Sequence, residues 1–424
     1  MAEIRIRWRT LEWAGAWFGL FLQTGAIFPM LLADSAGAIG DAGQAKLRAL
    51  NLPVYFIAAG LLARHWGQLG LAIRRNLPAV MLLLLPVMSL AWSLSPSLTM
   101  RRLVALLGSA LLSYLLAIRF TPRQLLVLMA CVLGPSMLLS LLMFAAHPSG
   151  EQSGVFIDKN GLGWMAAVAA VVGWAIASDR ALGLRPHGLT LLATALVCVA
   201  GSGSATAVMS VFAALIFAGV HKLLMRTHGV GRFFLILVLL QLAVAFLSSL
   251  HLVVVPLLDA LGKDATLTGR VPLWEEVDKS IALRPLLGYG YQTFWTPVNP
   301  EKWQIETAIG WGPPHAHNGY RDTILSLGFV GAAVLAIVIA RGASQGARLE
   351  FREPDEGWFW LNVLFGMFLT MNLTESLILR QNEFFWTMFM TYLLMFSLRC
   401  PSTAPVATTP WVVRSPPEIG AMTP

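Results

Sequence analysis

The sequence predicts an all-α polytopic membrane protein: a transmembrane helical bundle of about 12 spans with one large periplasmic loop. The first observation is composition, because 57% of the 424 residues are hydrophobic and only 12% are charged. A soluble domain this apolar could not cover its surface with polar side chains. The second is the recurrence of apolar runs long enough to cross about 30 Å of hydrocarbon. The third is a one-sided distribution of arginine and lysine between these runs.

The apolar runs follow one another along the chain and leave one long interval between the ninth and the tenth. The two runs within 188–220 are counted separately, because Gly201-Ser202-Gly203-Ser204 predicts a tight turn between them. The first run follows three arginines as in a signal peptide, but no small-residue cleavage site stands out after it, so we expect a retained span. The expected spans lie at about 12–33, 51–64, 76–92, 102–118, 124–146, 161–178, 188–202, 204–220, 233–256, 320–340, 357–373 and 382–398.

Four regions follow from this division. Residues 1–256 are expected to hold transmembrane helices one to nine, and residues 257–319 to form the large loop that carries the site. Residues 320–399 are expected to hold the last three helices. Residues 400–424 are rich in proline and are predicted to form a disordered cytoplasmic tail.

Arginine and lysine indicate the orientation. With the N-terminus in the cytoplasm, the cytoplasmic segments carry eighteen of these residues and the short segments on the other side carry six. The positive-inside rule therefore predicts that the 257–319 loop faces the periplasm. The net charge of +8 is assigned to this anchoring, so no nucleic-acid binding is inferred.

Four shorter segments are expected on the same side as the large loop: 92–102, 154–161, 201–206 and 374–380. Their polar and charged residues lie mostly at the ends of the spans. A proton or ion transporter would more often place ionisable residues within the spans.

The large loop looks like a site because it gathers histidines, tryptophans, glycines and arginines between spans. Its Trp and Tyr content argues against disorder. Arg270 follows a glycine there, and a guanidinium is a fixed fork of donors that matches phosphate oxygens. The functional interpretation is a phosphate contact, and the structural one is a surface arginine touching lipid headgroups. The residue alone favours neither.

His317 stands beside Asn318 where the loop returns to a span. An imidazole with a reference pKa of about 6.5 can accept a proton from a sugar hydroxyl at neutral pH, although a histidine at a membrane interface also serves as a polar anchor. His315 is two residues earlier, so an extended backbone would present both imidazoles on one side. No third ligand stands at usable spacing, so no metal site is predicted.

Glu375 lies at the outer end of a span, where a buried carboxylate needs a cationic partner. That partner is Arg380 or an arginine of another segment, and either a bracing ion pair or a catalytic role fits. The chain has no Asp-x-Asp pair and no Walker-type loop, so neither a divalent metal nor a nucleotide cofactor is expected. None of the three cysteines lies in the large loop, so no disulfide framework is predicted.

Taken in order, these motifs resemble the O-antigen ligase and O-antigen polymerase superfamily, and within it the exopolysaccharide polymerisation proteins. The resemblance extends from about Trp92 to Glu375. It rests on Trp92-Ser93 with the segment to Arg102, Lys159-Asn160, Gly269-Arg270 with Trp274, Pro285-Leu286-Leu287-Gly288-Tyr289-Gly290, His317-Asn318 with Gly328 and Gly331, and Asn372-Leu373-Thr374-Glu375-Ser376.

The resemblance implies a metal-independent membrane glycosyltransferase of the GT-C-like type without a cofactor, in the bacterial inner membrane, with its site on the periplasmic side. The donor would be an undecaprenyl-diphosphate-linked glycan. A polymerase passes the glycan to another lipid-linked repeat unit, and a ligase passes it to a lipid A core. The resemblance assigns the diphosphate to Arg270 and the acceptor hydroxyl to His317. Membrane lipids, a flippase and a chain-length regulator are the other expected partners.

One departure from the family pattern is Ala205, where members commonly carry Arg or Lys. The missing cation would be supplied by another residue of the expected substrate-binding set. A ligase is the closest alternative function. A lipid-linked glycan transporter is an alternative of another class, which would have a charged central cavity and no need for a histidine in the outer loop. The expected substrate-binding residues are Arg101, Arg102, Lys159, Asn160, His315, Asn318, Arg321 and Glu375, of which Arg101, Arg102, Lys159 and Arg321 are the replacement cations.

Overall fold

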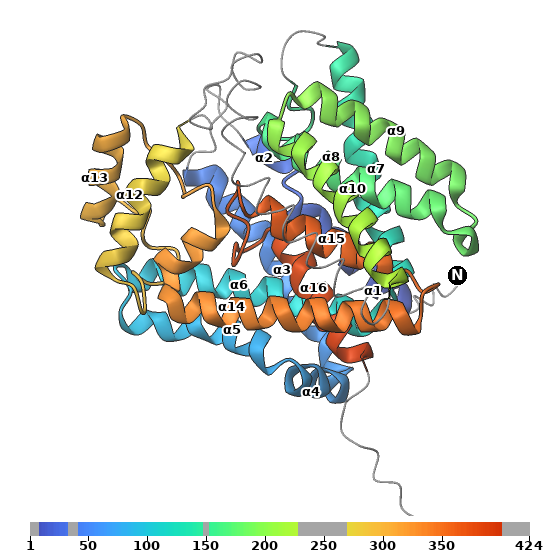
Figure 1. Cartoon of the computed structure of the whole chain (residues 1–424), viewed down its shortest axis with the longest axis horizontal. Helices are drawn as coiled ribbons and strands as arrows, with labels where there is room; N and C mark the ends of the chain where they lie inside the picture. The colour runs from blue at the N-terminus through green and yellow to red at the C-terminus, as the bar shows by residue number, and fades with distance from the viewer. Residues whose placement is uncertain (1–7, 33–40, 147–151, 228–268, 401–424) are drawn as a thin grey trace, which may run out of the picture.

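The fold was analysed in a computed structural model that describes residues 8–32, 41–146, 152–227 and 269–400. All regular elements in these residues are helices, as the sequence predicts (Figure 1). They are α1 (Trp8–Gln23), α2 (Phe28–Leu32), α3 (Asp41–Ala63), α4 (Trp66–Arg75), α5 (Leu77–Met88), η1 (Ser89–Ala91), α6 (Pro96–Arg119), α7 (Pro122–Ala146), α8 (Lys159–Ser178), η2 (Arg180–Leu182), α9 (Arg185–Ser202), α10 (Ala205–Arg226), α12 (Arg270–Leu283), α13 (Pro300–Ile309), α14 (Gly319–Arg352), α15 (Trp358–Met371) and α16 (Phe384–Arg399).

Every expected span within the described residues overlaps at least one helix, while the expected span 233–256 and the tail 401–424 lie outside them. Six described helices are long and apolar enough to cross a membrane, and α4 with α5, bent by 89°, would make a seventh. The helices α15 and α16 are apolar but shorter. The total of about twelve spans therefore stays a prediction.

The expected first span, 12–33, is wrong as a continuous helix. α1 ends at Gln23 and α2 begins at Phe28. Between them Gly25 and Ile27 have positive φ angles of 70° and 63°, which a helix cannot contain. Hydropathy does not register this interruption, because the residues on both sides of it are apolar.

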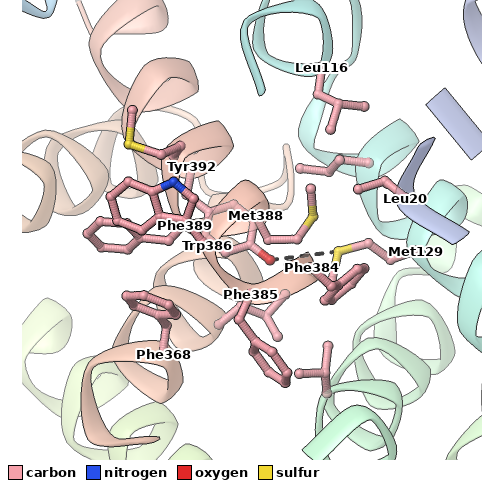
Figure 2. Packing of buried hydrophobic residues seen from close by; sticks show 14 of the residues in the cluster. Leu20, Leu116, Met129, Phe368, Phe384, Phe385, Trp386, Met388, Phe389 and Tyr392 are labelled. Carbon is pink, nitrogen blue, oxygen red and sulfur yellow. Dashed lines mark hydrogen bonds between the residues drawn. The ribbon is translucent and has the colours of Figure 1, made fainter. Parts of the chain in front are cut away.

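The helix α16 forms the hydrophobic axis of the bundle. All residues in 384–397 are buried, and a helix that is apolar on every side belongs in an interior. Figure 2 shows Phe389 of α16 beside Phe368 of α15, and their rings stack with centroids 4.4 Å apart. On another side of α16, the Tyr392 hydroxyl lies 3.7 Å from the Met129 sulfur of α7.

Close packing of α8 against α9 depends on two glycines. A Cβ at Gly173 would lie 2.6 Å from the backbone nitrogen of Leu192, and one at Gly188 would lie 2.4 Å from that of Ala177. Small residues that let backbones approach are typical of helix pairs in membranes. The turn that follows α9 is the predicted one, because Gly203 is left-handed and Ser204 caps α10.

Charged residues assigned to the cytoplasmic side meet at one end of the bundle. The Glu12 carboxylate is buried and pairs with Arg119 at 2.7 Å and Arg9 at 2.8 Å. Arg123 pairs with Asp179 at 2.7 Å. These contacts join α1, α6, α7 and the α8–η2 junction at their expected cytoplasmic ends.

The four segments expected on the other side meet the large loop at the opposite end. α6 runs from one end of the bundle to the other. Its first turn contacts the large loop, and its last residue, Arg119, lies about 36 Å away along its 24 residues in the cluster around Glu12. Segment 92–102 contacts residue 287, segment 154–161 contacts the 201–206 turn, and that turn contacts segment 374–380. The predicted grouping of these segments is therefore confirmed in space, while the side of the membrane stays a prediction.

The described part of the large loop, 269–318, is ordered and has its own core. α12 and α13 pack around Leu273, Val277, Phe294 and Ile305, and this cluster continues onto Leu325 of α14. The loop therefore forms a small helical module seated on the first turns of α14 (Figure 1).

The helix α14 is broken at Gly328, whose φ of 67° and ψ of −170° are not helical. The loop segment 285–290 supplies the backbone partners that the break removes. A Cβ at Gly328 would lie 2.0 Å from the Leu286 oxygen, so only glycine fits there. The four inter-segment bonds are Tyr289 N to Leu325 O at 2.8 Å, Gly290 N to Ser326 O at 3.0 Å, Phe329 N to Pro285 O at 2.7 Å and Val330 N to Leu286 O at 3.3 Å.

Candidate functional site

The candidate site is centred on Glu375, whose side chain is only 2% exposed. One carboxylate oxygen lies 3.0 Å from Nη2 of Arg270 and accepts a hydrogen bond of 3.4 Å from the Thr206 hydroxyl. The other oxygen lies 3.7 Å from Nδ1 of His317. Four segments, from α10, α12, the loop before α14 and the turn after α15, thus meet at one buried carboxylate.

Arg270 is placed by the start of α12. It is the first helical residue, and Gly269 before it is the N-cap with a left-handed φ of 82°. Its Nη1 also donates to the Thr374 carbonyl oxygen at 2.5 Å. The partner of Glu375 is therefore an arginine of another segment, which was one of the two alternatives, and not Arg380. Since a guanidinium has five N–H groups, Arg270 retains donors beyond these two bonds.

His317 has a left-handed backbone, with φ of 48°. Such a conformation in a residue other than glycine costs on the order of 1–3 kcal/mol and persists where the surroundings enforce it. His317 therefore does not have the extended backbone that would place both imidazoles on one side. The reversal still brings the two imidazoles together, with ring centroids 4.2 Å apart. The His317 backbone N–H donates to Nδ1 of His315 at 3.2 Å.

His315 is held neutral. Because its Nδ1 accepts a hydrogen bond, its proton must be on Nε2. Burial, followed by the neighbouring groups His317, Arg380 and Arg270, lowers the pKa of His315 to about 2. Within the described residues, no group of three His, Cys, Asp or Glu side chains is arranged to hold a metal ion.

Asn318 fixes the position of His317. It is the N-cap of α14, and its side-chain oxygen accepts from the backbone nitrogens of Tyr320 and Arg321. Its side-chain nitrogen donates to the Leu373 carbonyl at 3.2 Å, and its backbone nitrogen donates to the Ser376 hydroxyl at 3.1 Å. The side-chain amide and the backbone N–H of Asn318 are thus bonded to residues on either side of Glu375, which is a structural use of a residue expected to bind substrate.

Asp322 is a site residue that the sequence reasoning missed. Its carboxylate accepts from Trp295 Nε1 at 2.7 Å, from the Ala316 backbone nitrogen at 3.0 Å and from the Ser376 hydroxyl. Ala316 precedes His317 and Ser376 follows Glu375, so Asp322 sets the distance between the two functional side chains. Its position four residues after Asn318, on the same helix face, was the available signal.

Asn372 was not among the expected site residues, although it belongs to the family-like segment 372–376. It is fully buried, and its side-chain oxygen accepts from the backbone nitrogens of Leu377 and Ile378 at 3.0 and 3.1 Å. The turn that carries Glu375 therefore folds around this amide. Gly319 N donates to both the Asn372 and Glu375 carbonyls, which ties the turn to the start of α14.

Asn160 is brought near the site through the α9–α10 turn. Its side-chain oxygen accepts from the Ser204 hydroxyl at 3.0 Å, two residues before Thr206, which contacts Glu375. Lys159 precedes Asn160 as the first residue of α8. These contacts bring the family-like Lys-Asn motif and the turn that contains Ala205 to the same side of Glu375.

The other predicted cations are placed differently. The Arg102 guanidinium donates to the Gln292 carbonyl, and Arg101 is exposed on the surface of α6. Arg321 forms a two-pronged ion pair with Asp278, with distances of 2.8 and 2.9 Å, and lies over the Trp274 ring. Arg102 and Arg321 are thus already engaged with protein groups.

An open groove of about 600 Å³ runs between α12 and α14 beside the site. Its wall includes Asn318, the neighbour of His317, and the Asp278–Arg321 pair stands at its polar part. The remaining lining is mostly apolar: Ile281, Ala282, Tyr320, Ile324 and Phe329.

Two comparisons with known proteins bear on this site. Residues 190–336 match the sequence profile of a family described as O-antigen ligase, and this region contains Arg270, His317 and Asp322 but not Glu375. The exopolysaccharide production protein ExoQ of Rhizobium meliloti (strain 1021) is 28% identical over 299 residues, covering 65% of this chain. The match spans 66% of that relative, just under two thirds of its length.

Proposed function

We propose that this chain is a membrane glycosyltransferase that polymerises lipid-linked oligosaccharide repeat units. Both matches support assigning it to the O-antigen ligase and polymerase superfamily. The resemblance seen in the sequence motifs is thereby confirmed at the level of the superfamily. The donor in this proposal is an undecaprenyl-diphosphate-linked glycan, and the product is exopolysaccharide or O-antigen. The name of the relative, an exopolysaccharide production protein, favours polymerisation.

The observation that carries the proposal is the buried Glu375 carboxylate between Arg270 and His317. The fold assembles an arginine, a carboxylate and a histidine from three separate segments of the chain, at the end of the bundle where the large loop lies. Residues gathered in this way supply a cation for a diphosphate and a base for a hydroxyl.

In the proposed reaction, the hydroxyl of the acceptor sugar attacks the anomeric carbon of the donor. A new C–O bond forms, and the bond from that carbon to the diphosphate oxygen breaks with its electron pair. His317 accepts the hydroxyl proton on Nε2, because its Nδ1 is the nitrogen directed at Glu375. The Glu375 carboxylate stabilises the imidazolium that results, as a buried acid does for a catalytic histidine.

Arg270 has two roles in this scheme. Its bonds to Glu375 and to the Thr374 carbonyl hold the carboxylate in place. Its remaining N–H groups stabilise the charge that develops on the departing diphosphate, a contribution of a few kcal/mol in comparable sites. Neither role requires a divalent metal, so we propose metal-independent catalysis.

The proposed site faces the periplasm of a bacterial inner membrane, as the distribution of arginine and lysine favours. The donor must then be carried across the membrane before it reacts, which makes a flippase a functional partner. A chain-length regulator is the other proposed partner.

A ligase is the second candidate function, and the description of the matched family favours it. The same three side chains would then transfer the glycan to a lipid A core. The two reactions use the same catalytic residues and differ only in the molecule that accepts the glycan.

The deciding experiment is reconstitution of the purified protein with defined undecaprenyl-diphosphate repeat units, with and without a lipid A core acceptor and in excess chelator. A ladder of glycan lengths supports the polymerase. A single transfer to the core supports the ligase. Translocation without new glycosidic bonds contradicts both, and activity that returns only with added magnesium or manganese contradicts the metal-independent mechanism.

A further inference from the structure

The turn between α12 and the α14 break exposes large apolar side chains. We call residues 283–287 the leucine turn. Leu283 and Leu286 are each 67% exposed, and the turn is held against Phe329, which is 52% exposed on α14. Leu287 and Val330 complete one apolar surface, because the backbone bonds at the break hold the turn and the helix side by side. A patch of this kind marks contact with a protein or a membrane.

The position of Phe329 along α14 indicates which partner covers this surface. Between Asp322 and Arg341 the helix carries no charged residue. Those nineteen steps would rise about 29 Å in a straight helix, close to the thickness of the hydrocarbon layer. Phe329, the first residue after the break, lies twelve residues and about 18 Å from Arg341 along uninterrupted apolar helix, which corresponds to a depth inside that layer. The leucine turn is bonded to the helix at this level.

The carbonyls of the leucine turn, though not the backbone N–H groups of Leu286 and Leu287, are paired within the described part of the protein. Irregular backbone at membrane depth is tolerated only where the protein satisfies its polar groups. Pro285 has no N–H to satisfy. All four carbonyls from residue 284 to residue 287 accept bonds, from Gly288 N at 3.2 Å, Phe329 N at 2.7 Å, Val330 N at 3.3 Å and Trp92 Nε1 at 2.9 Å.

The leucine turn contains one charged residue, Arg284. The chain carries no charged side chain between Arg284 and Glu301. The Arg284 guanidinium lies over the Tyr289 ring at 4.8 Å, so the charge is folded back toward the loop module.

We propose that the leucine turn is embedded in the hydrocarbon of the leaflet on the site's side, with lipid acyl chains as its partner. α12 then stands with its last turn in the membrane, and Arg270 lies at its other end. The 14 residues of α12 place Arg270 about 20 Å from Leu283, so the embedded turn fixes how far the site stands above the bilayer. This inference concerns the membrane only and holds whether or not the proposed reaction is correct.

The test uses single-cysteine variants of the full chain, with Cys131, Cys198 and Cys400 replaced by alanine. Leu286→Cys is the test position, Phe329→Cys the control within the membrane and Thr307→Cys, exposed on α13, the aqueous control. Each protein is labelled with a bimane fluorophore and reconstituted in phosphatidylcholine vesicles with doxyl-labelled lipid. We expect Leu286 to be quenched as strongly as Phe329 and several-fold more than Thr307.

A second position and a second assay distinguish membrane burial of the turn from misfolding of the Leu286→Cys variant. Leu283→Cys, at the other end of the turn, should give the same quenching, and a membrane-impermeant sulfonate thiol reagent should react with Thr307→Cys but not with either leucine position. Quenching of both leucine positions no stronger than that of Thr307, with rapid aqueous modification, overturns the proposal. Disulfide cross-linking between copies at Leu286→Cys also overturns it, because a second copy of the chain would then cover the surface.

Discussion

Arg270 and Glu375 form an ion pair of 3.0 Å across 105 residues of sequence, and the guanidinium is 19% exposed while the carboxylate is 2% exposed. The pair joins the start of α12 to the turn after α15. The two partners differ in burial, and this difference decides how the stability of the site responds to mutation. A charge that loses its partner costs more free energy when it is the more buried of the two.

The first prediction is a double-mutant cycle on this pair. Arg270→Ala should destabilise the protein more than Glu375→Ala, since it leaves a buried carboxylate without its cation. We expect losses of about 2–4 and 1–2 kcal/mol, reduced from the values for fully buried pairs by solvent at Arg270. The double variant should recover part of the stability and none of the activity. Thermal unfolding in detergent measures the cycle, and purely additive losses would contradict a bracing pair.

The second prediction separates chemistry from strain at His317. Asn tolerates a left-handed backbone, whereas Ala does not, so His317→Asn removes the base without adding strain. We expect His317→Asn to lower the polymerisation rate about 100-fold or more with little change in Tm. His317→Ala should lose the same activity and additional stability. Activity of His317→Asn near that of the wild type would show that His317 is only an anchor.

The third prediction concerns acid sensitivity. The pKa of His315 is lowered to about 2 by burial and by His317, Arg380 and Arg270, whereas in the unfolded chain it is about 6.5. Between these values the unfolded chain binds a proton that the folded protein does not, so lowering the pH favours unfolding. The Tm of the wild type should fall from about pH 7 to pH 4, and His315→Asn should reduce that fall. The exposed His187→Asn serves as the control and should leave the pH dependence unchanged.

The fourth prediction uses the shape of the guanidinium. Arg270→Lys keeps the charge but loses the fork that reaches both the Thr374 carbonyl and Glu375. We expect at least a tenfold loss of polymerisation rate. Arg123→Lys is the matched control, since Arg123 also pairs with a carboxylate, that of Asp179, which is 12% exposed, but at the other end of the bundle. Equal losses in both variants would mean that the effect is one of stability.

Most of the helices could be predicted from the sequence, and so could the polar residues that the fold brings together in the candidate site. Apolar runs report helices directly, because a span must satisfy its backbone internally. Arg270 and His317 stood out as polar groups next to such runs. The pairing of Arg270 with Glu375 could not be predicted, because no local periodicity links residues that far apart.

The two interruptions in helical structure could not be predicted from the sequence. Hydropathy averages over a window, so the interruption between α1 and α2 and the kink at Gly328 both disappear inside apolar runs. Gly288 and Gly290 have left-handed φ angles of 65° and 95°, as turn glycines do. A Cβ at either position would meet backbone at 2.5 Å, from Leu325 and Ser93 respectively, so they also permit close contact between segments.

The fifth prediction tests the orientation. Thr307 is exposed on α13 in the large loop. A cysteine at this position, in the background without native cysteines, should react with a membrane-impermeant reagent once the outer membrane alone is opened. Reaction that requires permeabilised inner membrane would place the loop, and the proposed site with it, in the cytoplasm.

The break in α14 bears on the order in which the protein is assembled. A helix interrupted within the hydrocarbon leaves backbone groups open, each at a cost of several kcal/mol. The segment that closes them, 285–290, precedes α14 in the chain and is therefore synthesised first. The partners of the broken helix are thus already made when α14 reaches the membrane. Variants of Gly328 should therefore fail during insertion and appear as degraded protein, before any catalytic defect could be measured.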